Sequence, residues 1–216
     1  MTDYTVTELD LSGRNLTILP DLFLYTNLQT LYCGNNKLTS LDNLPPNLQR
    51  LDCYNNQLTS LDNLPPNLQR LDCFNNQLTS LENLSQNLQT LNCFNNQLTS
   101  INNLPITLQT LRCGGNQLTS LDNLPPNLQE LWCRHNKLTS LENLPPNLQK
   151  LSCLKNQLTS LDILPPTLQT LFCSHNPIYT TCKELYGFEL SEKTIEQYNK
   201  IKHMENLEKE CCPLLK

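Results

Sequence analysis

The segment LQRLDCYNNQLTSLDNLPPN, residues 48–67, carries the pattern that decides the fold. The same 20-residue pattern runs from residue 28 to residue 176 without insertion or deletion, in eight copies. The copies begin at Leu28, Leu48, Leu68, Leu88, Leu108, Leu128, Leu148 and Leu168. A fixed period this short is typical of a solenoid, in which each unit buries its apolar side against its neighbours. The sequence therefore predicts one elongated domain.

Each copy divides into a strand and a return leg. The triplet LDC at 51–53 alternates apolar and polar residues, which predicts a short strand that pairs in parallel with its copies. Leu58, Leu61 and Leu64 then return to the core, and the Pro65-Pro66 pair argues against a helix there. We therefore expect a curved right-handed superhelix, with a parallel β-sheet on the concave face and an extended, polyproline-like convex side.

Two residue types recur once per copy at a fixed place. An asparagine follows each strand, and we expect its amide to turn inward and bond backbone groups that the bend leaves unpaired. A cysteine ends each strand triplet in place of an aliphatic residue, and we expect it to be buried as a small hydrophobe. The asparagines are Asn36, Asn56, Asn76, Asn96, Asn116, Asn136, Asn156 and Asn176. The cysteines are Cys33, Cys53, Cys73, Cys93, Cys113, Cys133, Cys153 and Cys173.

The N-terminal sequence MTDYTVTELDL carries acids and neither a basic region nor an apolar core, so we expect no signal peptide. Reduced thiols are then favoured over disulfides, and the expected location is intracellular, in the cytoplasm of the producing or host cell. The net charge of −5 disfavours nucleic acid and anionic membranes as partners. We expect no cofactor and no metal.

The pattern L-x-x-L-x-(L/C)-x-x-N-x-L resembles leucine-rich repeats, over roughly residues 6–178. The 20-residue length with N-L-P-P-x-L resembles the short subclass found in secreted effector proteins of enteric bacterial pathogens. The wording C-x-N-N-Q-L-T-S-L is similar to repeat proteins of giant amoeba viruses. The resemblance implies partner binding on the concave strand face. Some bacterial relatives carry a ubiquitin-ligase domain after the repeats, but the roughly forty residues that follow the last repeat here are too few for one.

The two ends depart from the repeat. Residues 1–27 read as a divergent N-terminal repeat or cap, with Arg14 where the asparagine belongs. The regular repeats occupy 28–178. Residues 179–216 change composition and are expected to form a C-terminal cap with a helix at about 191–209, beginning after the N-cap residue Ser191.

Comparison of the copies separates constant columns from variable ones. The glutamine at the second position is identical in all eight copies, from Gln29 to Gln169, and reads as scaffold or as a surface ladder. Variable columns flank and include the strand, where side chains are expected to point outward. The mid-strand column is Tyr32, Asp52, Asp72, Asn92, Arg112, Trp132, Ser152 and Phe172. The column after the cysteine is Gly34, Tyr54, Phe74, Phe94, Gly114, Arg134, Leu154 and Ser174.

These columns predict a three-rung aromatic strip formed by Tyr54, Phe74 and Phe94 on successive copies. They also predict a charge lattice formed by Arg50, Arg70, Asp52 and Asp72, and a basic patch around the single tryptophan. Exposed aromatic and arginine side chains are the usual anchors of protein interfaces. The predicted partner-binding residues are Tyr54, Phe74, Phe94, Arg112, Trp132 and Arg134. Arg112 is also expected to stack on Trp132. Neutral drift of unconstrained surface positions is the alternative explanation of the variation.

The leading functional hypothesis is a non-enzymatic protein–protein interaction scaffold that binds a protein partner on its concave face. The alternative is a substrate-recruiting adaptor subunit of a ubiquitin-ligase or similar enzyme complex, docked through the C-terminal helix. A catalytic cysteine or a zinc site is the least supported, since it rests only on Cys133-x-His135 and Cys173-x-His175, where the cysteine is expected to point inward.

Overall fold

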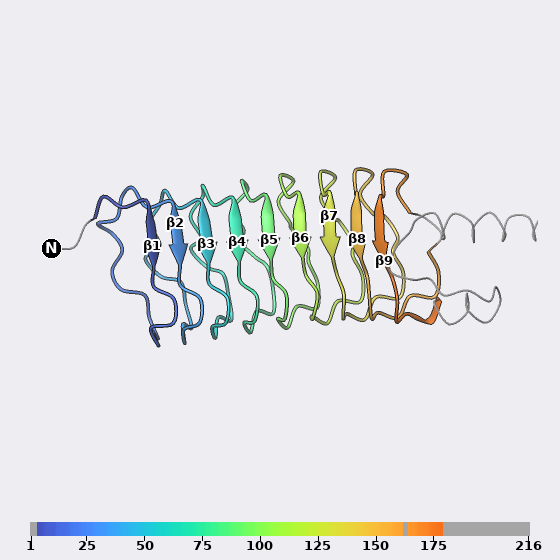
Figure 1. The fold of residues 1–216 in the computed structure, drawn as a ribbon, viewed down its shortest axis with the longest axis horizontal. Coiled ribbons are helices and arrows are strands. Elements are labelled where there is room, and N and C mark those ends of the chain that lie inside the picture. The colour runs from blue at the N-terminus through green and yellow to red at the C-terminus, as the bar shows by residue number, and fades with distance from the viewer. Residues whose placement is uncertain (1–3, 162–163, 179–216) are drawn as a thin grey trace, which may run out of the picture.

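A computed structural model describes residues 4–161 and 164–178, and these residues form a solenoid built on one nine-stranded parallel sheet (Figure 1). The strands follow one another in chain order, and each pairs with the next in register, as Leu31 pairs with Leu51 and Leu51 with Leu71. The strands are β1 (Glu8–Asp10), β2 (Thr30–Tyr32), β3 (Arg50–Asp52), β4 (Arg70–Asp72), β5 (Thr90–Asn92), β6 (Thr110–Arg112), β7 (Glu130–Trp132), β8 (Lys150–Ser152) and β9 (Thr170–Phe172). The predicted parallel solenoid is confirmed.

Each strand begins one residue earlier than the sequence predicts. β3 spans Arg50–Asp52, and Cys53 lies just beyond it, although its amide still donates to the Asp72 carbonyl at 2.8 Å. The alternation is as expected, since Leu51 and Cys53 both point into the core with no exposed surface. All eight repeat cysteines are buried thiols outside any disulfide, which confirms the predicted packing.

The repeat asparagine closes the turn that follows each strand. The Asn56 amide nitrogen donates to the carbonyls of Cys33, Cys53 and Tyr54 at 3.0, 3.0 and 3.2 Å. Its oxygen accepts the Leu38 amide at 2.9 Å. One side chain therefore pairs backbone groups of its own copy and of the preceding copy, as predicted for a buried amide. The same set of bonds recurs around Asn96.

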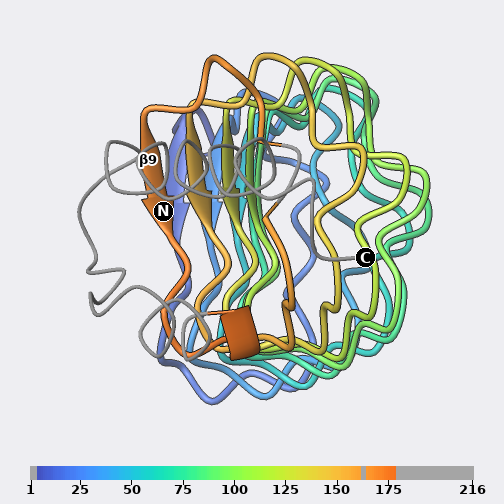
Figure 2. The ribbon, with the colours of Figure 1, turned by 90° about the vertical axis from the view of Figure 1, so that its right-hand side faces the viewer.

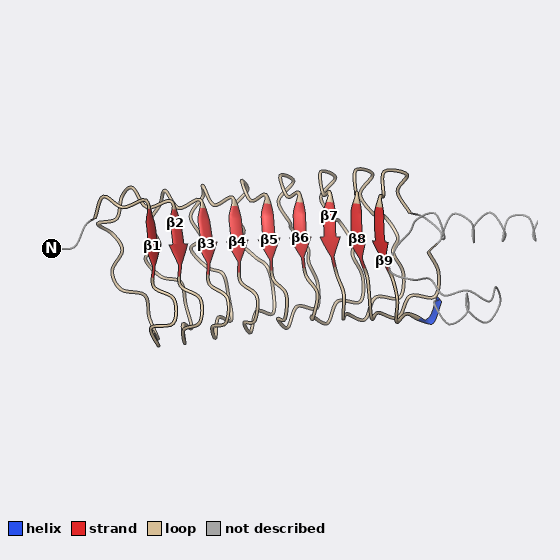
Figure 3. Cartoon of the chain, viewed as in Figure 1, coloured by secondary structure: helices blue, strands red, loops and turns tan. Residues whose placement is uncertain are grey.

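The return leg differs from the predicted extended, polyproline-like chain. It consists of two turns per copy, at 62–63 and at 66–67 in the second copy. Asn63 has a φ of 62°, and the Leu68 amide donates to the Pro65 carbonyl at 3.2 Å. Asparagine tolerates the left-handed backbone region and proline favours a turn. These residues therefore form two turns where we expected one continuous extended segment. The expected absence of helix within the repeats agrees with the described residues, where helical geometry occurs only at Pro177 and Ile178 (Figure 3).

The N-terminal segment joins the sheet through β1, where Leu9 pairs with Leu31. The Arg14 and Leu16 amides both donate to the Asn36 side-chain oxygen at 3.0 Å, so the first regular copy completes the divergent turn before it. Seen along the solenoid, the successive copies superpose into one loop with the strands on one side (Figure 2). The predicted C-terminal cap and its helix at about 191–209 lie outside the described residues. Among the described residues, no helix has the length and hydropathy that crossing a bilayer requires.

Candidate binding face

Five of the six predicted partner-binding residues line a single groove on the outer side of the sheet, which we call the strand face. Phe74, Phe94, Arg112, Trp132 and Arg134, together with Asn92, enclose about 390 Å³. Arg112 and Trp132 end β6 and β7, and the other three predicted residues follow the cysteine just beyond a strand. We call this the aromatic–arginine groove. The sixth residue, Tyr54, is not in its lining and instead stacks on Phe74 with ring centroids 4.7 Å apart and planes 1° from parallel.

The predicted three-rung aromatic strip is divided. Tyr54 and Phe74 stack on each other, whereas Phe94 pairs with the Arg134 guanidinium, whose carbon lies 4.8 Å from the ring centroid. The cause is Gly114 on the intervening copy. A Cβ at Gly114 would lie 2.9 Å from both Phe94 Cδ2 and Arg134 Cγ, so the two side chains meet over a position that has no side chain of its own.

Gly114→Ala is therefore expected to destabilise the protein by about 1–3 kcal/mol, because the new methyl group also approaches the Arg134 carbonyl oxygen, a backbone atom that cannot rotate away. Thermal or urea unfolding would measure the loss. The matched control is Gly34→Ala, where the nearest atoms belong to the ring of Tyr54, a half-buried side chain that can move without a shift of the backbone. Equal stability of the Gly114→Ala variant and the original protein would contradict the close packing at this position.

Trp132 does not pair with Arg112 as predicted. Its ring instead stacks on Phe172, with centroids 6.1 Å apart and planes 26° apart. These residues lie two strands apart, and the intervening residue is Ser152, which is only 2 % exposed. A small side chain between two large ones allows the rings to meet above it, as Gly114 does for Phe94 and Arg134. The cation–π pairs found in the described part of the chain are Arg134 on Phe94 and Arg50 on Tyr32.

The charged side chains of the strand face fall into paired and unpaired groups. Arg50 forms an ion pair with Asp52 at 2.7 Å, which leaves Asp52 buried rather than outward in an open lattice. Lys150 pairs with Glu130 at 2.7 Å, and this bond is the main reason that the pKa of Glu130 is lowered. In contrast, no carboxylate within residues 4–161 and 164–178 forms an ion pair with Arg112 or Arg134.

Asn92, in the lining of the groove, is held by two hydrogen bonds. The Asn92 amide nitrogen donates to Asp72 Oδ1 at 3.0 Å, and its oxygen accepts the Phe94 amide at 3.3 Å. Burial raises the pKa of Asp72, and the bond from Asn92 opposes that shift. Asn92 is thereby fixed as a wall of the groove.

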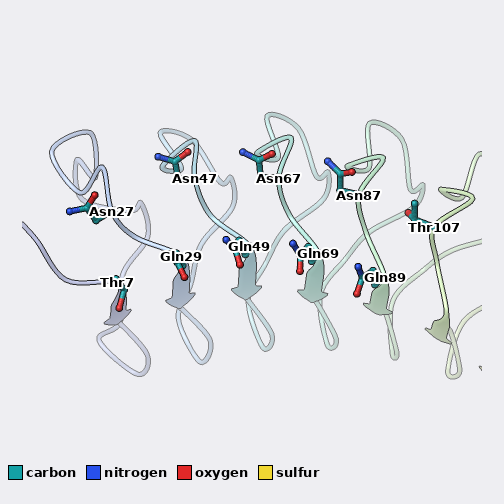
Figure 4. Close-up of a pocket in the computed structure, with 10 residues that line it drawn as sticks. All are labelled: Thr7, Asn27, Gln29, Asn47, Gln49, Asn67, Gln69, Asn87, Gln89 and Thr107. Atoms are coloured by element: carbon teal, nitrogen blue, oxygen red, sulfur yellow. The ribbon is translucent and has the colours of Figure 1, made fainter.

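A second groove of about 670 Å³ runs along the edge of the sheet where the strands begin, and it contains no ionisable residue (Figure 4). Its lining consists of Thr7, Asn27, Gln29, Asn47, Gln49, Asn67, Gln69, Asn87, Gln89 and Thr107. Asn47 and Asn87 donate to the carbonyls of Thr26 and Pro66 at 2.9 and 3.0 Å. The glutamine column was predicted as scaffold or surface ladder, and the surface ladder is what Figure 4 shows. The identity of the glutamine in every copy is the sequence feature from which this groove could have been predicted.

The weak signals for zinc or a cysteine nucleophile find no support. Cys133 is fully buried, and burial raises its pKa well above the ordinary value, whereas His135 is exposed. A thiol held in its protonated form is a poor nucleophile and a poor metal ligand. Among the described residues, no three His, Cys, Asp or Glu side chains are grouped so as to hold a metal ion.

The comparisons with known proteins agree with the repeat fold. A family model described as leucine-rich repeats in two copies matches residues 46–86, 66–105 and 106–146. The structure of YopM, a leucine-rich effector protein from Yersinia pestis, is similar at 36% identity with a TM-score of 0.73, over 77% of this chain and 48% of YopM. A Shigella effector leucine-rich repeat domain is similar at 29% identity with a TM-score of 0.65, over 78% of this chain and 82% of that domain.

The functional domain of InlJ from Listeria monocytogenes, described as including a cysteine ladder, is similar at 33% identity with a TM-score of 0.60, over 79% of this chain and 44% of InlJ. This chain thus spans less than half of the YopM and InlJ chains. No curated protein matches the sequence. The chain therefore has the leucine-rich repeat fold, with structural similarity to bacterial effector proteins of that fold. The similarity to giant-virus repeat proteins stays a prediction.

Proposed function

We propose that this protein is a non-enzymatic interaction scaffold that binds a protein partner through its strand face. This is the face that corresponds to the concave face of leucine-rich repeat proteins. Leucine-rich repeat proteins are generally protein-interaction scaffolds. The eight buried thiols favour a reducing compartment, so the proposed location is the cytoplasm of the producing or host cell.

One observation carries the proposal. The columns that build the coil between residues 28 and 176 are leucine, cysteine and asparagine, with Ile101 in place of one leucine. The variable columns gather three aromatic and two arginine side chains into the aromatic–arginine groove. Interfaces draw most of their binding free energy from a few aromatic and arginine residues in a central pocket. Random surface drift would scatter such residues rather than bring five of them to one groove.

The test is capture of partner proteins from lysate of the native host cell, identified by mass spectrometry. The double variant Phe74→Ala/Trp132→Ala is expected to lose at least one captured protein by about tenfold or more. The matched control is Phe23→Ala, since Phe23 is 79% exposed and lies outside the sheet. Arg134→Ala removes an exposed side chain and gives a second variant in case the double variant folds poorly. Undiminished capture by correctly folded variants would reject the proposal.

The adaptor alternative depends on the helix predicted at about 191–209. That helix lies outside the described residues, and no feature of the described part favours docking to a ligase. The interaction scaffold is therefore the better-supported function.

A further inference from the structure

The aromatic–arginine groove holds two guanidinium groups that form no ion pair with the described residues. Arg112 and Arg134 are exposed and form no ion pair within the described residues, while Arg50 and Lys150 on the same face are each neutralised by a carboxylate at 2.7 Å. Glu130, on the strand next to Arg112, bonds Lys150 at 2.7 Å, and the charge of Arg112 contributes only the smallest of the effects on the pKa of Glu130. Each free guanidinium offers five N–H donors in a planar fork that matches a carboxylate. The groove is thus supplied with donors for an anion that the chain itself does not provide.

The electrostatic environment on this side of the groove is positive, although the whole chain carries a net charge of −5. His135 follows Arg134, and its pKa is lowered by burial and then by the nearby charges of Lys155, Arg134 and His175. Burial is the larger cause of this shift, and the charges of Lys155, Arg134 and His175 add a positive potential beside the groove. Such a potential attracts an anionic partner and raises its association rate.

The remainder of the groove is apolar and already ordered. Phe74, Phe94 and Trp132 are half-buried, so each ring presents one surface to solvent. Arg134 is held against Phe94 at 4.8 Å, and Trp132 is held by its stack on Phe172. Side chains that are fixed before binding lose little conformational entropy when a ligand arrives.

We propose that the aromatic–arginine groove binds an acidic peptide segment that carries a large apolar side chain between its carboxylates. The apolar side chain packs on Phe94 and Trp132, and the flanking carboxylates bind Arg112 and Arg134. This inference rests on the proposed function and specifies its partner chemistry. A peptide is favoured over single-stranded nucleic acid, because the lining of the groove contains two arginines, which suits two discrete carboxylates, whereas a phosphate backbone needs a continuous row of cations.

The probe is the blocked synthetic peptide Glu-Glu-Phe-Glu-Glu, added to the full chain. Trp132 is the only tryptophan, so tryptophan emission reports on the groove without a label. A saturable change in emission is expected. Replacing the glutamates of the peptide by glutamine, or its phenylalanine by alanine, is expected to weaken binding by about tenfold or more. Bound carboxylates are also expected to raise the pKa of His135, which proton NMR would follow.

The protein variants Arg112→Gln and Arg134→Gln are each expected to weaken binding by about tenfold. The matched control Arg50→Gln removes a guanidinium from the same face that is already paired with Asp52, and should leave affinity within about twofold. No saturable change in emission, equal affinity for the glutamine peptide, or tighter binding of a single-stranded oligothymidylate would each overturn the inference.

The two proposals fail separately. If lysate capture depends on Phe74 and Trp132 while the acidic peptide does not bind, the partner chemistry is wrong and the interaction scaffold stands. If capture is also insensitive to these residues, the scaffold proposal fails with it.

Discussion

Raising the pH above about 9 is expected to unfold the protein over a narrow range, because seven buried thiols resist deprotonation in the folded state. Burial raises the pKa of Cys33 and Cys113 from 9.0 to about 12. It also raises the pKa of Cys53, Cys73, Cys93, Cys133 and Cys153. Between the unfolded and folded pKa values the unfolded chain binds fewer protons, so the free energy of unfolding falls as pH rises.

The slope is steep because the thiols act together. Each contributes about 1.4 kcal/mol per pH unit, so seven contribute about 10 kcal/mol per pH unit at the limit. A domain stable by about 5–15 kcal/mol would then lose its stability within roughly one to two pH units above 9. Below pH 9 the contribution is fully present and the free energy of unfolding should be nearly independent of thiol titration.

Urea unfolding at a series of pH values from about 7 to 11 would measure this slope. The double variant Cys93→Ala/Cys113→Ala is expected to flatten it by about 3 kcal/mol per pH unit, whatever its stability at neutral pH. Tyr4→Phe is the matched control, since it removes an exposed hydroxyl far from the thiol row and keeps the ring contact with Tyr25. A slope that does not change in the double variant would show that the thiols are not responsible.

Asn96→Ala is expected to destabilise the protein by about 3–5 kcal/mol, which is large for one side chain that contacts no ligand. Its amide nitrogen donates to the carbonyls of Cys73 and Cys93 at 3.1 Å, and its oxygen accepts the Leu78 amide at 3.0 Å. Truncation leaves the Leu78 amide buried and unpaired, at a cost of about 1–3 kcal/mol. The Cys73 and Cys93 carbonyls each lose one of two donors and keep the other, from Asn76 and Asn116, so each lost bond costs about 0.5–1.5 kcal/mol more.

Chemical denaturation monitored by circular dichroism would give the difference. Gln97→Ala is the matched control at the next residue, because the Gln97 side chain is exposed and only its backbone amide bonds the preceding copy. Comparable stability of the two variants would mean that water replaces the asparagine, and that the buried amide does not hold adjacent copies together.

The core could be predicted from the sequence because its determinants are local and repeated. Leu51 and Cys53 alternate within one strand, and Asn56 follows at a bend that must pair its backbone groups. Eight repetitions of the same choice leave no other face for these residues to occupy. The return leg could not be predicted as well, because the left-handed conformation of Asn63 depends on turn geometry rather than on hydrophobic period.

The composition of the groove could be predicted, but its internal pairing could not. The columns placed Phe94, Arg112, Trp132 and Arg134 on one face. Two side chains that lie two strands apart can meet only where the residue on the strand between them is small, as Gly114 and Ser152 are. Spacing along the chain does not indicate the orientation of a ring across the next strand. The predicted pairing of Trp132 with Arg112 is therefore wrong, and the ring stacks on Phe172 instead.

Each repeat asparagine accepts a hydrogen bond from the copy before it, so every copy depends on the next one to pair its backbone. The Leu38 amide is paired only when Asn56 is in place, and the Leu58 amide only when Asn76 is in place. A ribosome delivers the chain from its N-terminus, so each loop emerges with an open backbone amide and is completed by the loop synthesised after it. We therefore expect each loop of an emerging chain to be completed only after the next 20-residue copy has emerged.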